Sequence, residues 1–207
     1  MDFVHPVSSV IPGAQGQVLA VLAETSAELN LRTVARLAGV SASQASRVIP
    51  GLVDLGLVER REVPPSSLFC LNRENEAARL VVELARLRDN VLERLGTAAA
   101  ELPRPPASVI VFGSFARREA DRTSDIDVVF VRPDEVDPDD DAWTAGIDRW
   151  RENAAATTGN DIEVIDIGLT AAVGKLSDGG QLWEEIARDG VAIFGTSLQE
   201  LRDMADA

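Results

Sequence analysis

The sequence of 207 residues has a single cysteine and a single histidine, and it has no long apolar run. The lone Cys70 cannot form an internal disulfide, and no Cys/His cluster is present that could hold zinc. The first ten residues lack the features of a signal peptide. His5 is expected to lie in a loose N-terminus and to have no functional role. No stretch approaches the roughly 18 apolar residues that a membrane span requires. We therefore expect a cytoplasmic protein with no membrane partner.

The acidic excess of the chain lies in one part of it. Residues 1–73 carry six basic and six acidic side chains, so the whole net charge of −14 belongs to residues 74–207. An acidic body repels nucleic acid at long range but suits a site that gathers cations. This asymmetry predicts two domains, residues 1–75 and 76–207, with residues 76–102 as a helical connector.

The first 75 residues have the element order of a winged helix-turn-helix. Residues 17–25 predict a first helix, and Thr33 can cap a second. Ser41 or Ser43 can begin a third helix. Residues 57–71 then alternate, turn at two prolines and return, which predicts a β-hairpin wing.

The segment LRTVARLAGVSASQASRVIPGLVDLGLVERREV resembles winged helix-turn-helix regulators of bacteria. In such domains the third helix enters the major groove, and the wing touches the backbone or the minor groove. The resemblance implies DNA contacts from two places, the helix and the wing: Ser43, Gln44, Arg47, Arg60 and Arg61.

Two features of this domain argue against tight DNA binding. Pro50 lies inside the third helix and predicts a kink or an end after Ile49. The neutral charge of residues 1–73 also predicts weak electrostatic affinity for phosphates. A role in protein contacts therefore stays open beside DNA binding.

The stretch VIVFGSFARREADRTSDIDVVF carries the chemistry of the second domain. A buried strand ends at Gly113, where glycine lets the backbone approach a phosphate, and Ser114 opens a short helix that favours an anion. Asp125 and Asp127 are two residues apart in the next strand, so both carboxylates leave the same face. Because two such charges repel each other, we expect a cation between them, and Mg²⁺ fits best.

A third carboxylate is expected from the strand DIEVIDI, residues 161–167. Asp161 and Glu163 share one face of this strand, whereas Asp166 lies on the other. Glu163 is the central acid of its face and is favoured, although all three stay open. Three carboxylates can hold two metal ions about 3.5–4 Å apart, with Mn²⁺ as the alternative to Mg²⁺. The surrounding alternation of strands and helices predicts an α/β (α+β) domain with a small mixed sheet flanked by helices.

The segment GSFARREADRTSDIDVVF is similar to the Gly-Ser…Asp-x-Asp motif of the DNA polymerase β nucleotidyltransferase superfamily, particularly its minimal nucleotidyltransferases. Members move a nucleoside monophosphate from a nucleoside triphosphate to a hydroxyl or similar acceptor. The sequence departs at Arg118, where the family often has a small residue, and at Glu163, where it usually has aspartate. The resemblance implies metal-binding catalytic acids (Asp125, Asp127, Glu163) and a nucleotide-binding set (Gly113, Ser114, Arg117, Ser124).

The leading expectation is an enzyme, a magnesium-dependent nucleotidyltransferase that uses a nucleoside triphosphate, expected to be ATP. Its winged helix would guide it to DNA, RNA or protein, and DNA reading would call for a homodimer that supplies two half-sites. The acceptor, for which a protein and tRNA are both considered, is invisible in the sequence. Two alternatives stay open: a transcription regulator that only senses a nucleotide, and a toxin–antitoxin or defence component that modifies a protein or tRNA.

Overall fold

The computed structural model describes residues 1–205 and divides into two compact units. The first unit consists of Asp2 and residues 4–88, and the second contains Met1, Phe3 and the chain from Asp89 onward. The sequence-based limits of 1–75 and 76–207 stay a prediction about domains. Within residues 1–205, no helix is both long enough and apolar enough to cross a bilayer.

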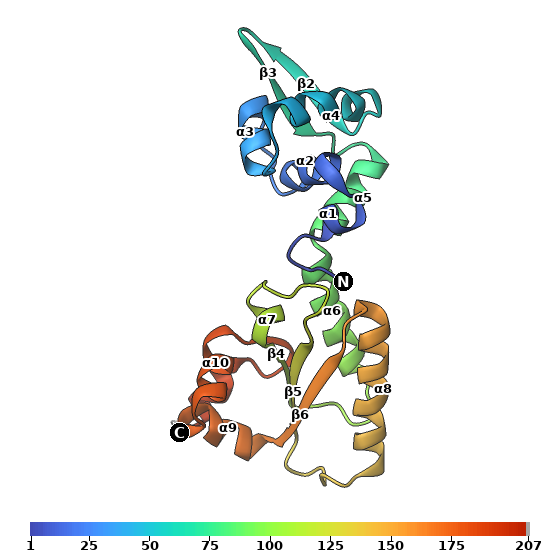
Figure 1. Cartoon of the computed structure of the whole chain (residues 1–207). Coiled ribbons are helices and arrows are strands. Elements are labelled where there is room, and N and C mark those ends of the chain that lie inside the picture. Colours follow the sequence, from blue (N-terminus) through green and yellow to red (C-terminus); the bar gives the residue numbers. More distant parts are fainter. Residues whose placement is uncertain (206–207) are drawn as a thin grey trace. The chain divides into compact units, whose positions relative to one another are not determined.

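The first unit contains five helices and a small antiparallel sheet of order β1-β3-β2 (Figure 1). Apolar side chains from α2, α3, α4 and the wing share one core, in which Leu22, Val34 and Leu52 are fully buried. The order of helices and wing confirms the winged helix-turn-helix expected from the sequence. In chain order the elements are α1 (Pro6–Val10), α2 (Gly13–Ala23), β1 (Leu29–Asn30), α3 (Leu31–Leu37), α4 (Ala42–Asp54), β2 (Val58–Val63), β3 (Ser66–Leu71) and α5 (Glu76–Ala85).

Side-chain caps decide where the two central helices begin. Asn30, and not Thr33 as expected, caps α3, because its Oδ1 accepts a hydrogen bond from the Thr33 backbone nitrogen at 2.9 Å. Ser41 caps α4: its Oγ accepts from the Gln44 nitrogen at 3.1 Å, while Gln44 Oε1 accepts from the Ser41 nitrogen at 2.9 Å. Such a reciprocal box satisfies two backbone donors that the first turn leaves unpaired.

The expected helix end after Ile49 is wrong, because α4 continues from Ala42 to Asp54. Pro50 and Ser46 are both exposed, so water can solvate the Ser46 carbonyl that loses its usual helical donor. On the opposite side of the helix, Ile49 and Leu52 are buried in the core. This packing outweighs the local cost of the proline.

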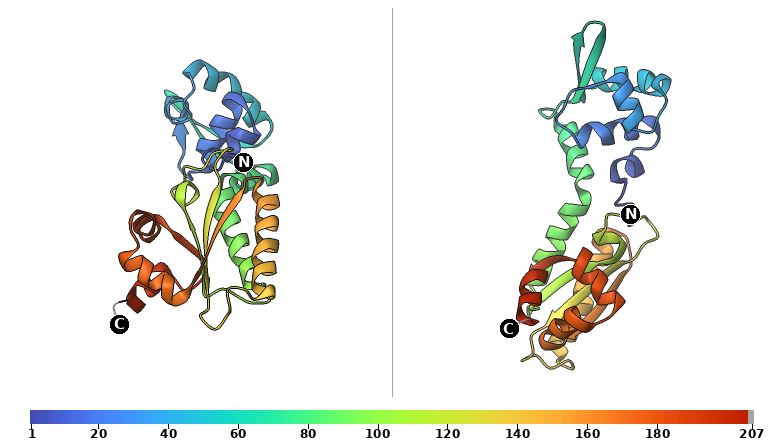
Figure 2. Two further views of the ribbon diagram at one scale, coloured as in Figure 1. Left: turned by 60° about the horizontal axis from the view of Figure 1, so that its bottom comes forward. Right: turned by 90° about the vertical axis from the view of Figure 1, so that its left-hand side faces the viewer.

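The second unit is built on a mixed sheet of order β6-β5-β4-β7, which confirms the expected class. β5 and β6 are parallel, whereas β4 is antiparallel to both β5 and β7. Helices cover both faces of this sheet (Figure 2). The elements are α6 (Leu87–Ala100), β4 (Ser108–Phe112), α7 (Gly113–Ala116), β5 (Ile126–Arg132), α8 (Asp141–Thr158), β6 (Ile162–Gly168), α9 (Leu169–Asp178), α10 (Gln181–Asp189), β7 (Val191–Gly195) and α11 (Leu198–Ala205).

Strand alternation assigns each side chain of β5 to one of two cores. On one face, the Phe130 ring meets Trp143 and Trp150 of α8, with centroids 6.3 and 4.9 Å apart. On the other face, Val129 and Val131 pack with residues of α9, α10 and α11. Because Asp127 has the same parity as Val129, its side chain leaves the sheet on this second face.

Candidate active site

Two acidic side chains stand next to each other on the parallel strands β5 and β6. Asp127 is in register with Glu163, and on its other side with Phe112, the last residue of β4. In-register neighbours of adjacent strands point to the same face of a sheet. Asp125 lies one residue before β5 begins and is exposed. The structure therefore gathers the predicted acids at the end of the sheet where β4 ends and β5 begins.

Electrostatics links these three carboxylates. Burial raises the pKa of Asp127, and the negative charges of Glu163 and Asp125 raise it further, whereas the Arg117 charge opposes them. Within residues 1–205, no three Asp, Glu, His or Cys side chains converge closely enough to make a ready metal site. The donor chemistry nevertheless fits a hard divalent cation, because the set consists of oxygen ligands whose mutual repulsion such an ion would relieve.

Gly113 is required at the end of β4 for two structural reasons. Its φ of +67° lies in the left-handed region, which side chains disfavour. A Cβ at this position would also collide with the Asp127 carboxylate, whose Cγ would be only 3.2 Å away. The glycine thus lets the acid of β5 lie directly against the backbone that follows β4.

The alternatives for the third carboxylate have different surroundings. Asp166 faces α8, where its Oδ2 accepts from Trp143 Nε1 at 3.0 Å and its Oδ1 lies 3.4 Å from Arg132 Nε. The Asp161 carbonyl accepts from the Ile126 nitrogen at 2.9 Å, and its side chain is exposed. Glu163 shares the face of Asp127, so its role as third ligand stays the favoured prediction.

The other two residues predicted to bind the nucleotide, Arg117 and Ser124, form hydrogen bonds within the loop between Ser114 and Asp125. The Arg117 guanidinium pairs with Glu119 at 2.9 Å, and this hydrogen bond raises the pKa of Arg117. Ser124 Oγ accepts from the Asp121 nitrogen at 3.0 Å and donates to Asp121 Oδ1 at 3.1 Å. Both side chains therefore stabilise the loop through bonds to its own residues. Their roles toward a nucleotide stay predictions.

Sequence reasoning missed Phe3 and Asn160, which shape this loop, and noted Arg118 only as a departure from the family pattern. Arg118 adopts a φ of 63°, and it is the only non-glycine residue with positive φ among residues 1–205. Phe3 packs on Phe115, and Asn160 donates to the carbonyls of the loop. The glycine that the family often has after Arg117 was the one available signal, since a left-handed position favours glycine.

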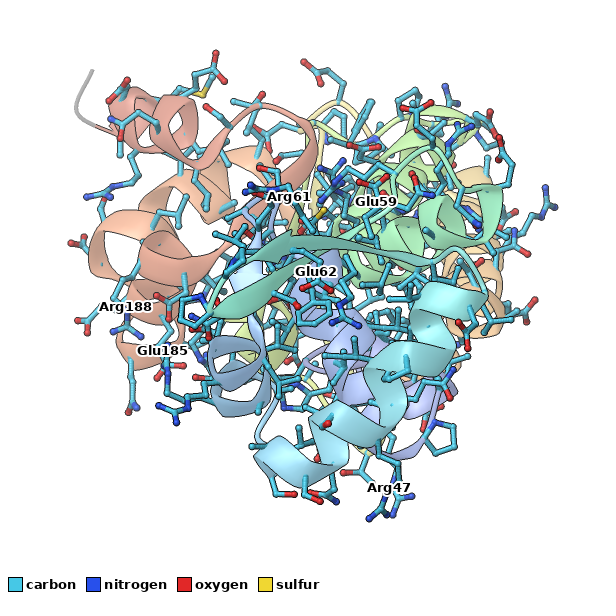
Figure 3. All side chains as sticks on the ribbon, turned by 90° about the horizontal axis from the view of Figure 1, so that it is seen from above. Arg47, Glu59, Arg61, Glu62, Glu185 and Arg188 are labelled. Atoms are coloured by element: carbon cyan, nitrogen blue, oxygen red, sulfur yellow. The ribbon has the colours of Figure 1, made fainter. Side chains whose placement is uncertain are left out.

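The predicted DNA contacts divide into an outward-facing group on α4 and a paired group on the wing. Ser43, Gln44 and Arg47 are exposed, and Figure 3 shows the Arg47 side chain extending outward from α4. On the wing, Arg61 Nε donates to Glu28 Oε1 at 2.6 Å, and Arg60 forms an ion pair with Glu62 at 2.6 Å. The wing arginines therefore have acidic partners within their own unit.

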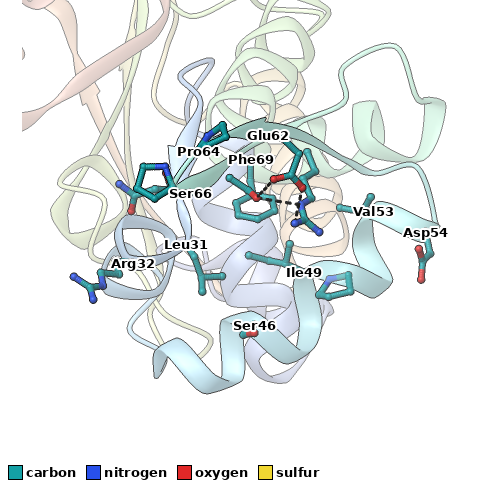
Figure 4. A pocket seen from close by; sticks show the side chains of 15 residues that line it. Leu31, Arg32, Ser46, Ile49, Val53, Asp54, Glu62, Pro64, Ser66 and Phe69 are labelled. Atoms are coloured by element: carbon teal, nitrogen blue, oxygen red, sulfur yellow. Dashed lines mark hydrogen bonds and ion pairs between the residues drawn. The ribbon is translucent and has the colours of Figure 1, made fainter.

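Each unit contains a hollow. A groove of about 1000 Å³ lies between α4 and the wing, with Ile49, Val53 and Phe69 among its lining residues (Figure 4). A smaller hollow of about 600 Å³ lies between α8 and β6, and Arg151 and Glu163 help to line it. Because α8 covers the sheet face opposite to that of Asp127, this hollow lies on the other side of the sheet from the Asp127 carboxylate.

Comparisons with known proteins assign a family to each part. A MarR family model matches residues 11–66, and a nucleotidyltransferase domain model matches residues 91–164. No curated protein matches the chain. The family models alone carry the assignment.

Similar solved structures overlap the chain only partly. One is a toxin–antitoxin crystallised with AMP-PNP, at 17% identity over 57% of this chain and 81% of that one, with a TM-score of 0.37. A mutant of the toxin–antitoxin MntA-HpeT has 13% identity over 57% and 80%, with a TM-score of 0.33. A MarR family transcriptional regulator from Rhodococcus sp. RHA1 has 25% identity over 42% and 63%, with a TM-score of 0.32. By its two family matches, the chain joins an N-terminal winged helix domain of the MarR family to a C-terminal nucleotidyltransferase domain.

Proposed function

We propose that the protein is a metal-dependent enzyme that transfers a nucleoside monophosphate from a nucleoside triphosphate, expected to be ATP, to an acceptor oxygen. The observation that best supports this proposal is the pairing of Asp127 with Glu163 beside Gly113. It places two acids beside a glycine turn, an arrangement that suits a triphosphate site. The nucleotidyltransferase family match to residues 91–164 supports the same reaction class.

Each part of the site has a role in this reaction. Asp125, Asp127 and Glu163 would hold Mg²⁺ or Mn²⁺, which when bound neutralises the triphosphate and steadies the leaving group. The backbone at Gly113 and the Ser114 hydroxyl would hold the phosphates. The acceptor hydroxyl gives up its proton to solvent, its oxygen bonds to the α-phosphorus, and the bond from that phosphorus to the departing pyrophosphate breaks. The chain's own contribution is mainly to position these groups.

The experiment that tests this proposal uses the full chain with nucleoside triphosphates labelled at the α-phosphate, a cell extract and Mg²⁺. We expect label to transfer to one macromolecular product, which mass spectrometry then identifies. Transfer should stop with EDTA and in Asp127→Asn. If the wild type binds triphosphate but transfers no label, the domain senses a nucleotide and the enzyme proposal fails. If the wild type does not bind triphosphate at all, the enzyme proposal and the nucleotide-sensor alternative both fail.

We further propose that the winged helix directs the enzyme to DNA through α4 more than through the wing. The MarR family match to residues 11–66 supports DNA binding. Because Arg60 and Arg61 already pair with acidic residues, we expect the wing to contribute little to this binding. Arg47 is then the main cationic contact. A part in a toxin–antitoxin or defence pair would instead show as transfer of label to the product of a neighbouring gene on co-expression.

A further inference from the structure

We infer that the N-terminal segment Met1–Phe3 is a working part of the nucleotidyltransferase site, in which Phe3 is a positioning residue for the loop of residues 117–125. This loop joins Gly113 and Ser114 to Asp125 and Asp127. The inference rests on the proposed function for the role of the loop. The contacts that hold the loop are independent of that function.

Phe3 contacts the loop and its preceding helix in two ways. Its ring meets Phe115 of α7 edge to face, with centroids 4.8 Å apart and an interplanar angle of 68°. Its backbone nitrogen donates to the Ala120 carbonyl at 3.1 Å. Phe3, Phe115 and Ala120 are 6%, 0% and 1% exposed, so all three residues are buried. This packing is that of a core and not of a trailing terminus.

Asn160 holds the same loop from a second side and also binds the N-terminal segment. Its Nδ2 donates to the carbonyls of Asp121 and Ser124, at 3.1 and 2.8 Å. Its Oδ1 accepts from the Met1 nitrogen at 2.7 Å. Asn160 is itself buried. One amide therefore joins the segment to the part of the loop that immediately precedes Asp125.

The loop depends on these contacts because it contains little that could anchor it. Among residues 117–125, Ala120 is the one apolar residue. The internal hydrogen bonds of the loop centre on the exposed Asp121 side chain, where competition with water leaves each bond a small net contribution. Arg118 adds the strain of a left-handed conformation. The Phe3–Phe115 ring contact and the hydrogen bond from Phe3 to Ala120 thus help to fix the path from Ser114 to Asp125.

The test compares Phe3→Ala with Phe3→Leu, and uses Val4→Ala as the matched control because Val4 is the exposed neighbour. Hydrogen exchange is measured on peptides covering residues 116–125, and affinity for ATP with Mg²⁺ is measured by calorimetry. In Phe3→Ala we expect exchange of these peptides to rise, and ATP affinity to fall, by roughly tenfold each. Phe3→Leu keeps an apolar contact and should lie between Phe3→Ala and wild type. Val4→Ala should match wild type.

The outcomes separate this inference from the proposed function. Wild-type exchange at residues 116–125 in Phe3→Ala would overturn it, and so would faster exchange with unchanged ATP affinity. If Phe3→Ala does not fold, the same two readouts in Phe3→Leu decide. If the wild type does not bind ATP, the proposed function fails and Phe3 cannot position a nucleotide site, even where exchange shows that it holds the loop.

Discussion

The Asp127 carboxylate lies against the Cα atom of Gly113, in the space where any other residue at position 113 would place its Cβ. The backbone turn that follows β4 and the acidic side chain on β5 are therefore in direct contact. Substitution of either residue should disturb the other.

We expect Gly113→Ala to lower the free energy of unfolding by about 1–2 kcal/mol, because the left-handed φ of +67° and the contact with Asp127 both oppose a side chain. For the same reason, a loss of ATP binding in a variant of Gly113 would not by itself show that the glycine contacts a phosphate. The control is Gly174→Ala in α9, where a Cβ meets nothing within 4 Å. There, alanine should stabilise by about 0.5–1 kcal/mol. Urea denaturation measures both, and equal stabilities of the two variants would contradict the prediction.

Asp127→Asn should raise the melting temperature of the metal-free protein while abolishing Mg²⁺-dependent ATP binding. The substitution removes a charge that burial, Glu163 and Asp125 all disfavour, but it also removes a metal ligand. Asp139→Asn, at an exposed loop position, is the control for loss of one negative charge. Calorimetry and thermal melting with EDTA give the two readouts. Undiminished ATP binding in Asp127→Asn would refute the metal assignment.

The three candidate third carboxylates predict different phenotypes. Glu163→Gln should abolish Mg²⁺-dependent ATP binding with little change in stability. Asp166→Asn should keep binding but lower stability, because Asp166 accepts from Trp143 and faces Arg132. Asp161→Asn, with an exposed side chain, should resemble wild type. Binding titrations and melting curves together distinguish the three variants. Loss of ATP binding in Asp166→Asn alone would identify Asp166, on the other face of the sheet, as the third metal ligand.

Arg118 is expected to tolerate glycine better than alanine. Its φ of 63° is unfavourable for any side chain, and its ion pair with Asp89 is exposed on both sides and contributes little. Arg118→Gly relieves the backbone strain, whereas Arg118→Ala keeps it and loses the pair. Arg118→Gly should therefore be more stable than Arg118→Ala by about 1 kcal/mol in urea denaturation. The reverse order would mean that the loop does not hold this conformation in solution.

DNA binding by the winged helix should respond oppositely to two substitutions. Arg47→Ala should weaken it, whereas Glu28→Gln should strengthen it by releasing Arg61, whose guanidinium now pairs with Glu28. Glu24→Gln removes an exposed charge on the same unit and is the control. Fluorescence anisotropy of genomic fragments at low and moderate salt measures the effects. Equal gains in Glu28→Gln and Glu24→Gln would point to overall charge and not to Arg61.

Much of the site was predictable because its signals are local. Gly113-Ser114 and Asp125-x-Asp127 each occupy a few residues, and strand alternation alone puts Glu163 and Asp166 on opposite faces. The parallel register that places Glu163 beside Asp127 involves residues 36 positions apart, so only the fold could decide it. The roles of these residues toward metal and nucleotide stay predictions.

The predictions that were wrong or missing have a common physical cause. Pro50 predicts a helix end by its local cost, but buried neighbours on the inner side of α4 outweigh that cost. Thr33 and Asn30 are both good capping residues. Because α3 begins directly after β1, Asn30 occupies the capping position. Phe3 shows no periodicity in a ten-residue segment, so nothing local predicted that Phe115 and Ala120 would bury it.

By itself, the sequence determined the winged helix, the mixed α/β domain and the acidic motif, because periodicity, capping residues and glycine positions act within one element or between adjacent ones. Only the tertiary structure decided which acids become neighbours, which arginines are paired and which distant segments hold the loop before Asp125. Those outcomes depend on contacts between residues far apart in the chain, and their energies come from burial and charge proximity that no local pattern contains.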